Sequence, residues 1–194
     1  MKKQSVTRGR GLLEKFLAKE RMKIANRFIL PRFRKGKILD IGCGSIPLFL
    51  LNTKFGEKYG IDPHVKEIKN IKEMQVNNNL NLIRFDIEKE SKLPFKENNF
   101  DVITMLAVFE HINPDKLIDV LKEVRKVLKL GGRFILTTPC TWTDKLLRFM
   151  VKLRLVSSEE MKDHKGAYNH KMIKSYLVKA GFKENKIKSF SFAH

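Results

Sequence analysis

Two glycines and a carboxylate mark the stretch of this sequence whose residue types and spacing suggest chemistry. Gly42 and Gly44 follow an apolar run that predicts a strand, in ILDIGCGSIPL at residues 38–48, and Asp62 ends a second such run in YGIDPH. Glycine has no Cβ, so the backbone can turn tightly and a ligand can approach it closely. A carboxylate at the tip of the next strand can accept hydrogen bonds from both hydroxyls of a ribose. The spacing therefore indicates a site for an adenosine.

Two neighbours of these residues narrow the kind of ligand. Pro47 stands where a dinucleotide fingerprint has its third glycine, which argues against a bound pyrophosphate. Asp40 comes directly before the turn, and a carboxylate at that point suits a cationic ligand better than a phosphate.

From these residues onward the chain resembles a known family, the class I S-adenosylmethionine (SAM) dependent methyltransferases, and within it the small type 11 branch. The resemblance extends over roughly residues 37–190. It rests on segments that come in the family's order, namely ILDIGCG, GIDPH, IRFDIEK, FDVITMLAVFEHI and LKEVRKVLKLGGRFILTTP.

The resemblance implies SAM as cofactor, with S-adenosyl-L-homocysteine (SAH) as its product. It makes Asp62 the acceptor for the ribose and places Asp86 beside the adenine amino group. The cofactor-binding residues that we expect on this basis are Asp40, Ile41, Gly42, Cys43, Gly44, Ile61, Asp62, Pro63, Asp86, Ile87 and Leu106.

The chemistry expected of such a cofactor makes modest demands on the protein. The methyl group sits on a sulfonium that is already activated, so alignment and desolvation can supply much of the acceleration. A general base is needed only if the acceptor must lose a proton. The candidates are His111 and Glu110, after the fourth expected strand, and His164 and Tyr168 further on. Each also has a structural interpretation, as a turn cap or as a support of the last helix.

Several kinds of chemistry are disfavoured. No N-P-P-Y or D-P-P-Y follows the fourth expected strand, which counts against amino methylation of adenine in nucleic acid. Cys140 follows the fifth strand rather than the fourth, unlike the nucleophile of cytosine C5 methyltransferases, and Cys43 is interpreted as a small turn residue. The two cysteines have no metal-ligand spacing, so we expect no bound metal.

Strands and helices alternate along the chain, which predicts an α/β fold. We expect a Rossmann-like, doubly wound and mainly parallel sheet with helices on both faces, in three layers. One helix should cover Asp115 to Leu130 and end at Gly131-Gly132, and the last should begin at Asn169 and end at Gly181. The expected strands are 37–42, 58–63, 81–86, 100–107, 133–139 and 186–192. Little chain follows the sixth strand, so the family's final antiparallel strand is expected to be missing, which would leave an open sheet edge.

These elements are expected to form a single domain over residues 1–194. It would comprise a basic helical arm (1–36), the SAM-binding core (37–139), a lid or acceptor-side segment (140–168) and the last helix and strand (169–194). The segment 145–156 interleaves basic and apolar residues. We interpret it as a lid over the acceptor, with ordinary packing or membrane contact as alternatives.

Charge is the second feature of the sequence that needs an explanation. The net charge is +19, and residues 1–37 hold 13 basic and 2 acidic side chains. Such an arm could bind RNA, anionic lipid or a phosphorylated substrate, although a chain rich in lysine throughout makes scattered solvated charge the preferred interpretation. No apolar run is long enough to span a bilayer, and MKKQSVTRGR lacks the core of a signal peptide, so we expect a cytoplasmic protein without a transmembrane segment.

The function expected from the sequence is methyl transfer from SAM to an unidentified small-molecule acceptor. Two alternatives remain open: a methyltransferase acting on RNA or another macromolecule through the basic arm, and a SAM-binding protein without catalysis. The oligomeric state is not indicated by the sequence.

Overall fold

The computed structural model describes residues 12–65, 79–90, 92–138, 165–166 and 168–190. Five strands form one parallel sheet in the order β3-β2-β1-β4-β5. They are β1 (Lys37–Ile41), β2 (Glu57–Asp62), β3 (Leu80–Arg84), β4 (Phe100–Leu106) and β5 (Leu128–Thr137). The helices are α1 (Leu12–Arg27), α2 (Leu48–Leu51), α4 (Pro114–Val127) and α7 (His170–Lys179), with 3-10 turns η1 (Pro31–Phe33), η2 (Phe109–His111) and η3 (Glu184–Lys186).

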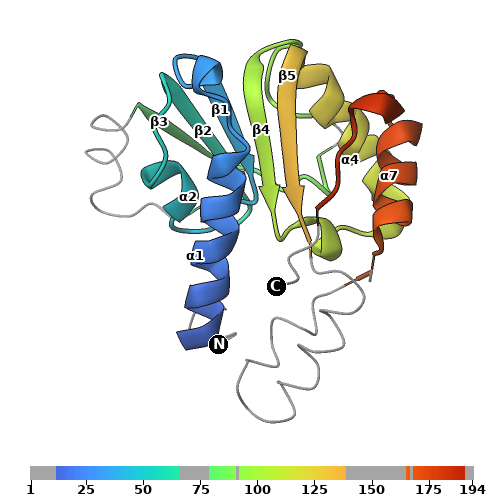
Figure 1. Cartoon of the computed structure of the whole chain (residues 1–194), viewed down its shortest axis with the longest axis horizontal. Coiled ribbons are helices and arrows are strands. Elements are labelled where there is room, and N and C mark those ends of the chain that lie inside the picture. Colours follow the sequence, from blue (N-terminus) through green and yellow to red (C-terminus); the bar gives the residue numbers. More distant parts are fainter. Residues whose placement is uncertain (1–11, 66–78, 91, 139–164, 167, 191–194) are drawn as a thin grey trace.

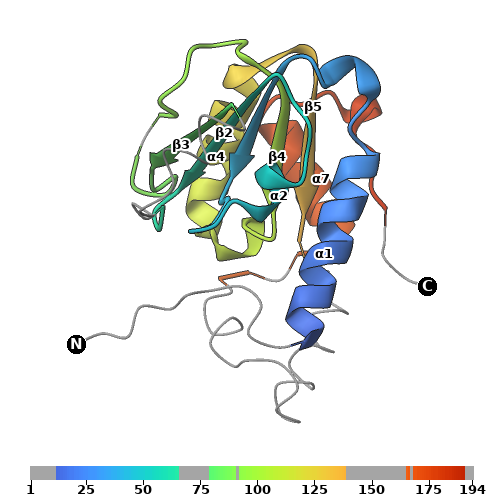
Figure 2. The same cartoon turned by 90° about the vertical axis from the view of Figure 1, so that its left-hand side faces the viewer.

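The expected α/β architecture is confirmed (Figures 1 and 2). One face of the sheet packs against α4 and α7, in a core that includes Leu39, Ile103 and Leu121. The other face packs against α1 and α2, around Ile38 and Val102. Neighbouring residues of a strand point to opposite faces, so both faces of a strand carry apolar side chains where both faces of the sheet are covered.

Two expected boundaries are wrong, namely the end of the helix that precedes the fifth strand and the start of that strand, which is Leu128 instead of residue 133. The helix α4 ends at Val127 rather than Leu130, because Leu128 is already extended and pairs with Phe100 as the first residue of β5. Gly131 and Gly132 therefore lie inside a strand instead of terminating a helix.

The sixth strand is not found over the described part of its expected range, residues 186–190. The chain there forms the end of η3 and an irregular segment, and Phe190 stacks on Phe28 with ring centroids 4.9 Å apart. The segment 145–156 lies outside the described ranges. The sequence also predicts a polar helix over residues 67–79 that ends in a turn, and of these residues only Asn79 is described, in a turn.

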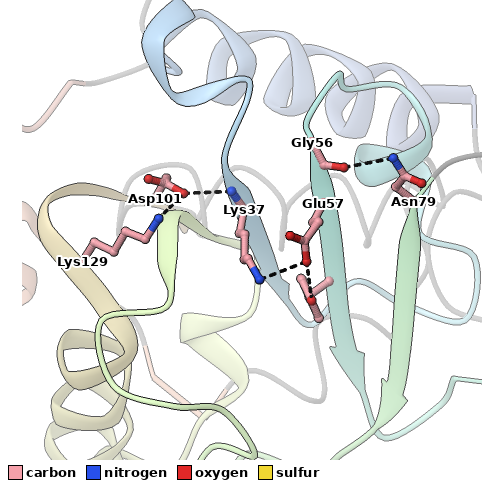
Figure 3. A network of polar contacts seen from close by, with 7 residues as sticks. Lys37, Gly56, Glu57, Asn79, Asp101 and Lys129 are labelled. Atoms are coloured by element: carbon pink, nitrogen blue, oxygen red, sulfur yellow. Dashed lines mark hydrogen bonds and ion pairs between the residues drawn. The ribbon is translucent and has the colours of Figure 1, made fainter.

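A polar network joins the amino ends of the strands (Figure 3). The Asp101 carboxylate accepts from the main-chain N–H of Lys37 and from Lys129 Nζ, each at 2.8 Å. Lys37 Nζ lies 3.0 Å from Glu57 on β2. These contacts tie β1, β2, β4 and β5 together at the edge opposite the carboxyl ends, where open α/β sheets bind ligands.

Candidate active site at the carboxyl edge of the sheet

The turn after β1 contains two glycines in the left-handed region, which the structure requires for different reasons. Gly42 has φ +73° and Gly44 has φ +77°. A Cβ on Gly42 would collide with the side chain of Val108, so Gly42 lets the turn after β4 approach closely. At Gly44 the nearest atom to such a Cβ is the carbonyl oxygen of Ile46, at 3.8 Å. This is an ordinary van der Waals distance, so the protein does not crowd Gly44 and a ligand can approach its backbone.

The carboxylate of Asp62 lies against this turn. Its Oδ2 accepts from the Gly44 N–H at 2.9 Å and its Oδ1 from the His64 N–H at 2.8 Å. The main-chain oxygen of Ile61 accepts from Gly42 and Cys43, at 2.8 and 3.2 Å. A carboxylate has about four acceptor sites, so Asp62 retains capacity for two ribose hydroxyls while it holds the turn.

Several other expected cofactor residues have buried side chains. Ile41 and Ile61 are fully buried, with side chains in the core shared with α4 and α7. Leu106 is buried on the opposite face of the sheet. The main-chain oxygen of Pro63 accepts from Arg84 at 3.2 Å.

Asp40 is buried beneath the turn, where Thr104 of β4 donates to its Oδ1 at 2.7 Å. The sequence analysis missed Thr104. Its signal was a lone hydroxyl within the apolar run that follows Asp101 in β4, at a position that the parallel pairing sets opposite Asp40.

Asp86 follows β3, as expected, and is engaged within its own turn. Its Oδ2 lies 3.0 Å from Lys89 Nζ, and its Oδ1 accepts from the Glu88 N–H at 3.1 Å. Burial alone would raise the pKa of Asp86, but these hydrogen bonds and the charge of Lys89 outweigh it and lower the pKa. The next residue, Ile87, lines a cleft of about 300 Å³ beside α4.

The turn after β4 is strained. Ala107 has φ +55°, which is uncommon for a residue with a Cβ. Its N–H donates to the carbonyl oxygen of Thr137, at the end of β5, at 2.9 Å. Such strain persists where the surroundings enforce it, typically at functional sites. The conformation of Ala107 places the next residue, Val108, with its side chain against Gly42.

Glu110 and Tyr168 are brought together on the far side of this turn. Each is 2% exposed, and the Tyr168 ring packs edge-on against Phe109 with centroids 4.8 Å apart. Within the described residues, Glu110 Oε2 and the Tyr168 hydroxyl are buried without a hydrogen-bond partner. Burial raises the pKa of Tyr168, and the hydroxyl of Tyr176 and the charge of Glu110 raise it further. His111 is half-buried next to Glu110, and His164 lies outside the described residues.

Lys165 fastens the chain that leads to Tyr168, a contact that the sequence analysis did not foresee. Its N–H donates to the Glu110 carbonyl oxygen at 2.8 Å, and its Nζ lies 2.6 Å from Glu88 Oε2. Glu88 Oε1 also accepts from the N–H of Asn113, the cap of α4, at 2.6 Å. The loop after β3, the turn after β4 and the segment before α7 are thereby joined at one point.

The described part of the chain contains no cluster of three or more His, Cys, Asp or Glu side chains arranged for a metal ion. Over the same residues, no helix combines the length and apolar character that crossing a membrane requires.

Comparison with known proteins gives a consistent result. Residues 39–136 match the family model of a methyltransferase domain. The chain is 37% identical over 103 residues to the sterol 4-C-methyltransferase strm-1 of Caenorhabditis elegans, covering 50% of this chain and 29% of that protein. It is 32% identical over 105 residues to the demethylmenaquinone methyltransferase of Staphylococcus haemolyticus, covering 51% and 41%. The chain thus matches less than half the length of either relative.

Among solved structures, the fold is similar to that of a SAM-dependent methyltransferase from Mesorhizobium loti. The TM-score is 0.61 at 17% identity, over 83% of this chain and 80% of that one. At this identity the similarity concerns the fold.

Proposed function

The chain belongs to the methyltransferase domain family, and on that premise we propose that it transfers a methyl group from SAM to a small-molecule acceptor. One observation carries the proposal: the Asp62 carboxylate is hydrogen-bonded to Gly44 N–H at a turn where no atom lies closer than 3.8 Å to the place of a Gly44 Cβ. This combination offers a ribose acceptor and an approachable backbone at one point of the carboxyl edge.

The residues of this edge fit the cofactor. Asp62 would accept from the ribose hydroxyls, and the backbone of residues 42–44 would lie along the methionine half. Asp86 and the main chain of Ile87 would lie beside the adenine. Bound SAM supplies an activated methyl group on its sulfonium. The buried carboxylate of Asp40, beneath the turn, favours a cation at this position.

The acceptor side would use Glu110 and Tyr168. The raised pKa of Tyr168 keeps its hydroxyl protonated at neutral pH, which favours a hydrogen-bond donor over a general base. Glu110 could take a proton, and its buried, unpartnered Oε2 would gain a hydrogen bond from an acceptor N–H or O–H. His111 and His164 remain candidates for the same role. We further propose that residues 140–168 cover the acceptor.

A small organic acceptor is favoured by the surface beside the turn. Ile46 and Leu48 are 51% and 50% exposed there, and small-molecule sites are lined mainly by apolar side chains. The two related enzymes are likewise named for a sterol and for demethylmenaquinone.

The experiment has two stages. Calorimetric titration with SAH tests cofactor binding, and methyl-labelled SAM is then incubated with a small-metabolite extract and, separately, with total RNA. We expect SAH binding and label in the metabolite fraction. Absence of SAH binding would refute the proposal, and SAH binding without any labelling would leave a SAM-binding protein without catalysis.

Methylation of RNA is the second candidate, because Lys19, Lys23 and Arg27 are exposed along α1. Figures 1 and 2 show the amino-terminal part of α1 extending past the carboxyl ends of β4 and β5. Label confined to the RNA fraction would select this function.

A further inference from the structure

One face of β2 contacts the cofactor turn and its following helix at successive points. Side chains two residues apart point to the same side of a strand, so Lys58, Gly60 and Asp62 share a face. That face is turned toward α2, whereas Tyr59 and Ile61 of the same strand pack on the other side. Asp62 binds Gly44, at the start of the segment from Cys43 to Thr53.

Lys58 binds the other end of this segment. It is only 5% exposed, and its Nζ donates to the carbonyl oxygens of Leu50, at 3.0 Å, and Thr53, at 3.4 Å. These carbonyls belong to the end of α2 and the turn beyond it, where a helix leaves its oxygens without partners. Burial lowers the pKa of Lys58. No described carboxylate forms an ion pair with it, so carbonyls alone hold this ammonium group.

Gly60, between Lys58 and Asp62 on β2, lies against side chains of the same segment. A Cβ at Gly60 would lie 2.8 Å from Cys43 Sγ and 3.0 Å from Leu50 Cδ1, closer than side-chain carbons pack. The missing side chain therefore creates the slot into which Cys43 and Leu50 fit. Since Cys43 lies between the two glycines of the turn, this slot fixes the distance of the turn from β2.

We propose that Lys58 and Gly60 are positioning residues for the cofactor, which with Asp62 hold residues 43–53 against β2 in the conformation that binds SAM. The inference rests on the proposed function. A buried ammonium that is bound only by carbonyls is costly for stability. Lys58 is thus better explained by the conformation that it imposes on the segment than by a contribution to folding.

The first test is Lys58→Met, which keeps the aliphatic stem and removes the ammonium. If the docked conformation falls to about one tenth of the population, the apparent Kd for SAH rises about tenfold. Lys54→Met makes the same change at the exposed lysine directly after this segment and should leave the Kd unchanged.

A second control separates positioning from general loss of stability. Asp101→Asn weakens the network at the opposite edge of the sheet (Figure 3). The melting temperature without ligand is measured for both variants. For each variant, the increase in the Kd is divided by the decrease in melting temperature. We expect this ratio to be larger for Lys58→Met than for Asp101→Asn. Equal effects per degree, or an unchanged Kd, would overturn the proposal.

The second test changes Gly60 and Cys43, which form the slot, and so does not depend on whether Lys58 variants fold. Gly60→Ala should weaken SAH binding several-fold because its methyl group displaces Cys43, and adding Cys43→Ala should restore part of the affinity by removing the sulfur. Additive losses in the double variant would contradict the slot. Failure of the parent protein to bind SAH would instead refute the proposed function, so the two failures are distinguishable.

Discussion

At Asp62, one carboxylate both holds the turn after β1 and offers acceptors to a ligand. Its two oxygens accept from Gly44 and His64, and the side chain is 7% exposed. Removing the carboxylate therefore has two effects on cofactor affinity: the ribose loses its charged acceptor, and the turn loses a hydrogen bond that fixes Gly44.

We expect Asp62→Ala to weaken SAH binding by about 2 to 3 kcal/mol, the scale of hydrogen bonds to a charged group. Asp62→Asn retains one carbonyl acceptor and should lose less. Calorimetric titration with SAH measures both, with melting temperatures showing that the variants fold. Affinities equal to that of the parent would remove Asp62 from the site.

For Tyr168 we predict that removing the hydroxyl lowers activity without lowering stability. Its hydroxyl is buried and, within the described residues, has no hydrogen-bond partner, so Tyr168→Phe should leave stability unchanged or slightly higher. If the hydroxyl contacts the acceptor, the turnover of labelled SAM should fall about tenfold or more. Unchanged turnover would assign Tyr168 to packing alone.

The same residue predicts a pH dependence. The pKa of Tyr168 is raised above its usual value of 10.0, so the phenol stays protonated as the pH rises to that value. Turnover in the parent should show no inflection from Tyr168 between pH 7 and about pH 10. An inflection in this range that disappears in Tyr168→Phe would mean that the phenolate acts as a base.

At the scale of single residues, the sequence predicted those contacts whose partners lie near one another along the chain. Gly42, Gly44 and Asp62 lie within one strand-turn-helix-strand unit, so their spacing along the sequence is enough to predict that they lie close together in space. Thr104 reaches Asp40 only through the pairing of β1 with β4. Lys165 meets Glu88 across 77 positions of the chain. Contacts of this kind depend on strand order, which no single segment encodes.

Among the elements, the turn after β1 can be tested against a matched control within the fold. Gly44 and Gly131 both have φ close to +78°, and a Cβ at either position would collide with no described atom. Valine at either position imposes a similar strain, of about 1 to 3 kcal/mol. Only Gly44 lies in the proposed site, since Gly131 lies near the amino end of β5.

We therefore expect Gly44→Val and Gly131→Val to lower stability to a similar extent, while only Gly44→Val abolishes SAH binding. Thermal melting gives the first quantity and calorimetry the second. Equal binding by the two variants would mean that the turn after β1 does not contact the cofactor.

The helix boundaries show where local signals mislead. Asn169 caps α7, where the last helix is expected to begin, and Asn113 caps α4 in the same way. A side chain that accepts from the first turn of its helix is a local interaction, which the sequence can indicate. The end of α4 was wrong because a glycine pair indicates a helix terminus in isolation. Pairing of Leu128 with Phe100 on β4 converts these residues to strand instead.

At the scale of the whole molecule, the two edges of the sheet differ in kind. The amino edge is joined by ion pairs between strands (Figure 3). The carboxyl edge has the turn after β1, where Asp62 binds Gly44, and the turn after β4, where Ala107 has a positive φ. Positive φ also occurs near the amino edge, at Asn79, Asn98 and Gly131, so the distinguishing feature is the carboxylate beside the turn. Fixed strands at one edge and specialised turns at the other are the division expected of an α/β enzyme, where loops on a rigid scaffold carry function.

The excess charge belongs to the same scale, and the structure separates its structural part from its free part. Arg34 is structural: its guanidinium donates to Thr53 Oγ1 at 2.7 Å and to the carbonyl oxygen of Asn26 at 3.0 Å, and it lies over the Phe55 ring. Reversing its charge would damage the packing of α1. Lys19 and Arg27 are exposed and suit such a test better.

We expect Lys19→Glu combined with Arg27→Glu to leave methyl transfer to the metabolite fraction unchanged, because neither residue belongs to the proposed site. RNA binding should be weak in the parent protein, since solvated charges scattered along a helix provide no aromatic platform for bases. If α1 instead bound RNA through five or six phosphates, the parent's affinity would fall about 10³-fold between 50 and 200 mM salt. Binding measured over this range decides between the two. Steep salt dependence together with loss of RNA labelling in the double variant would show that α1 binds the acceptor and that the acceptor is RNA.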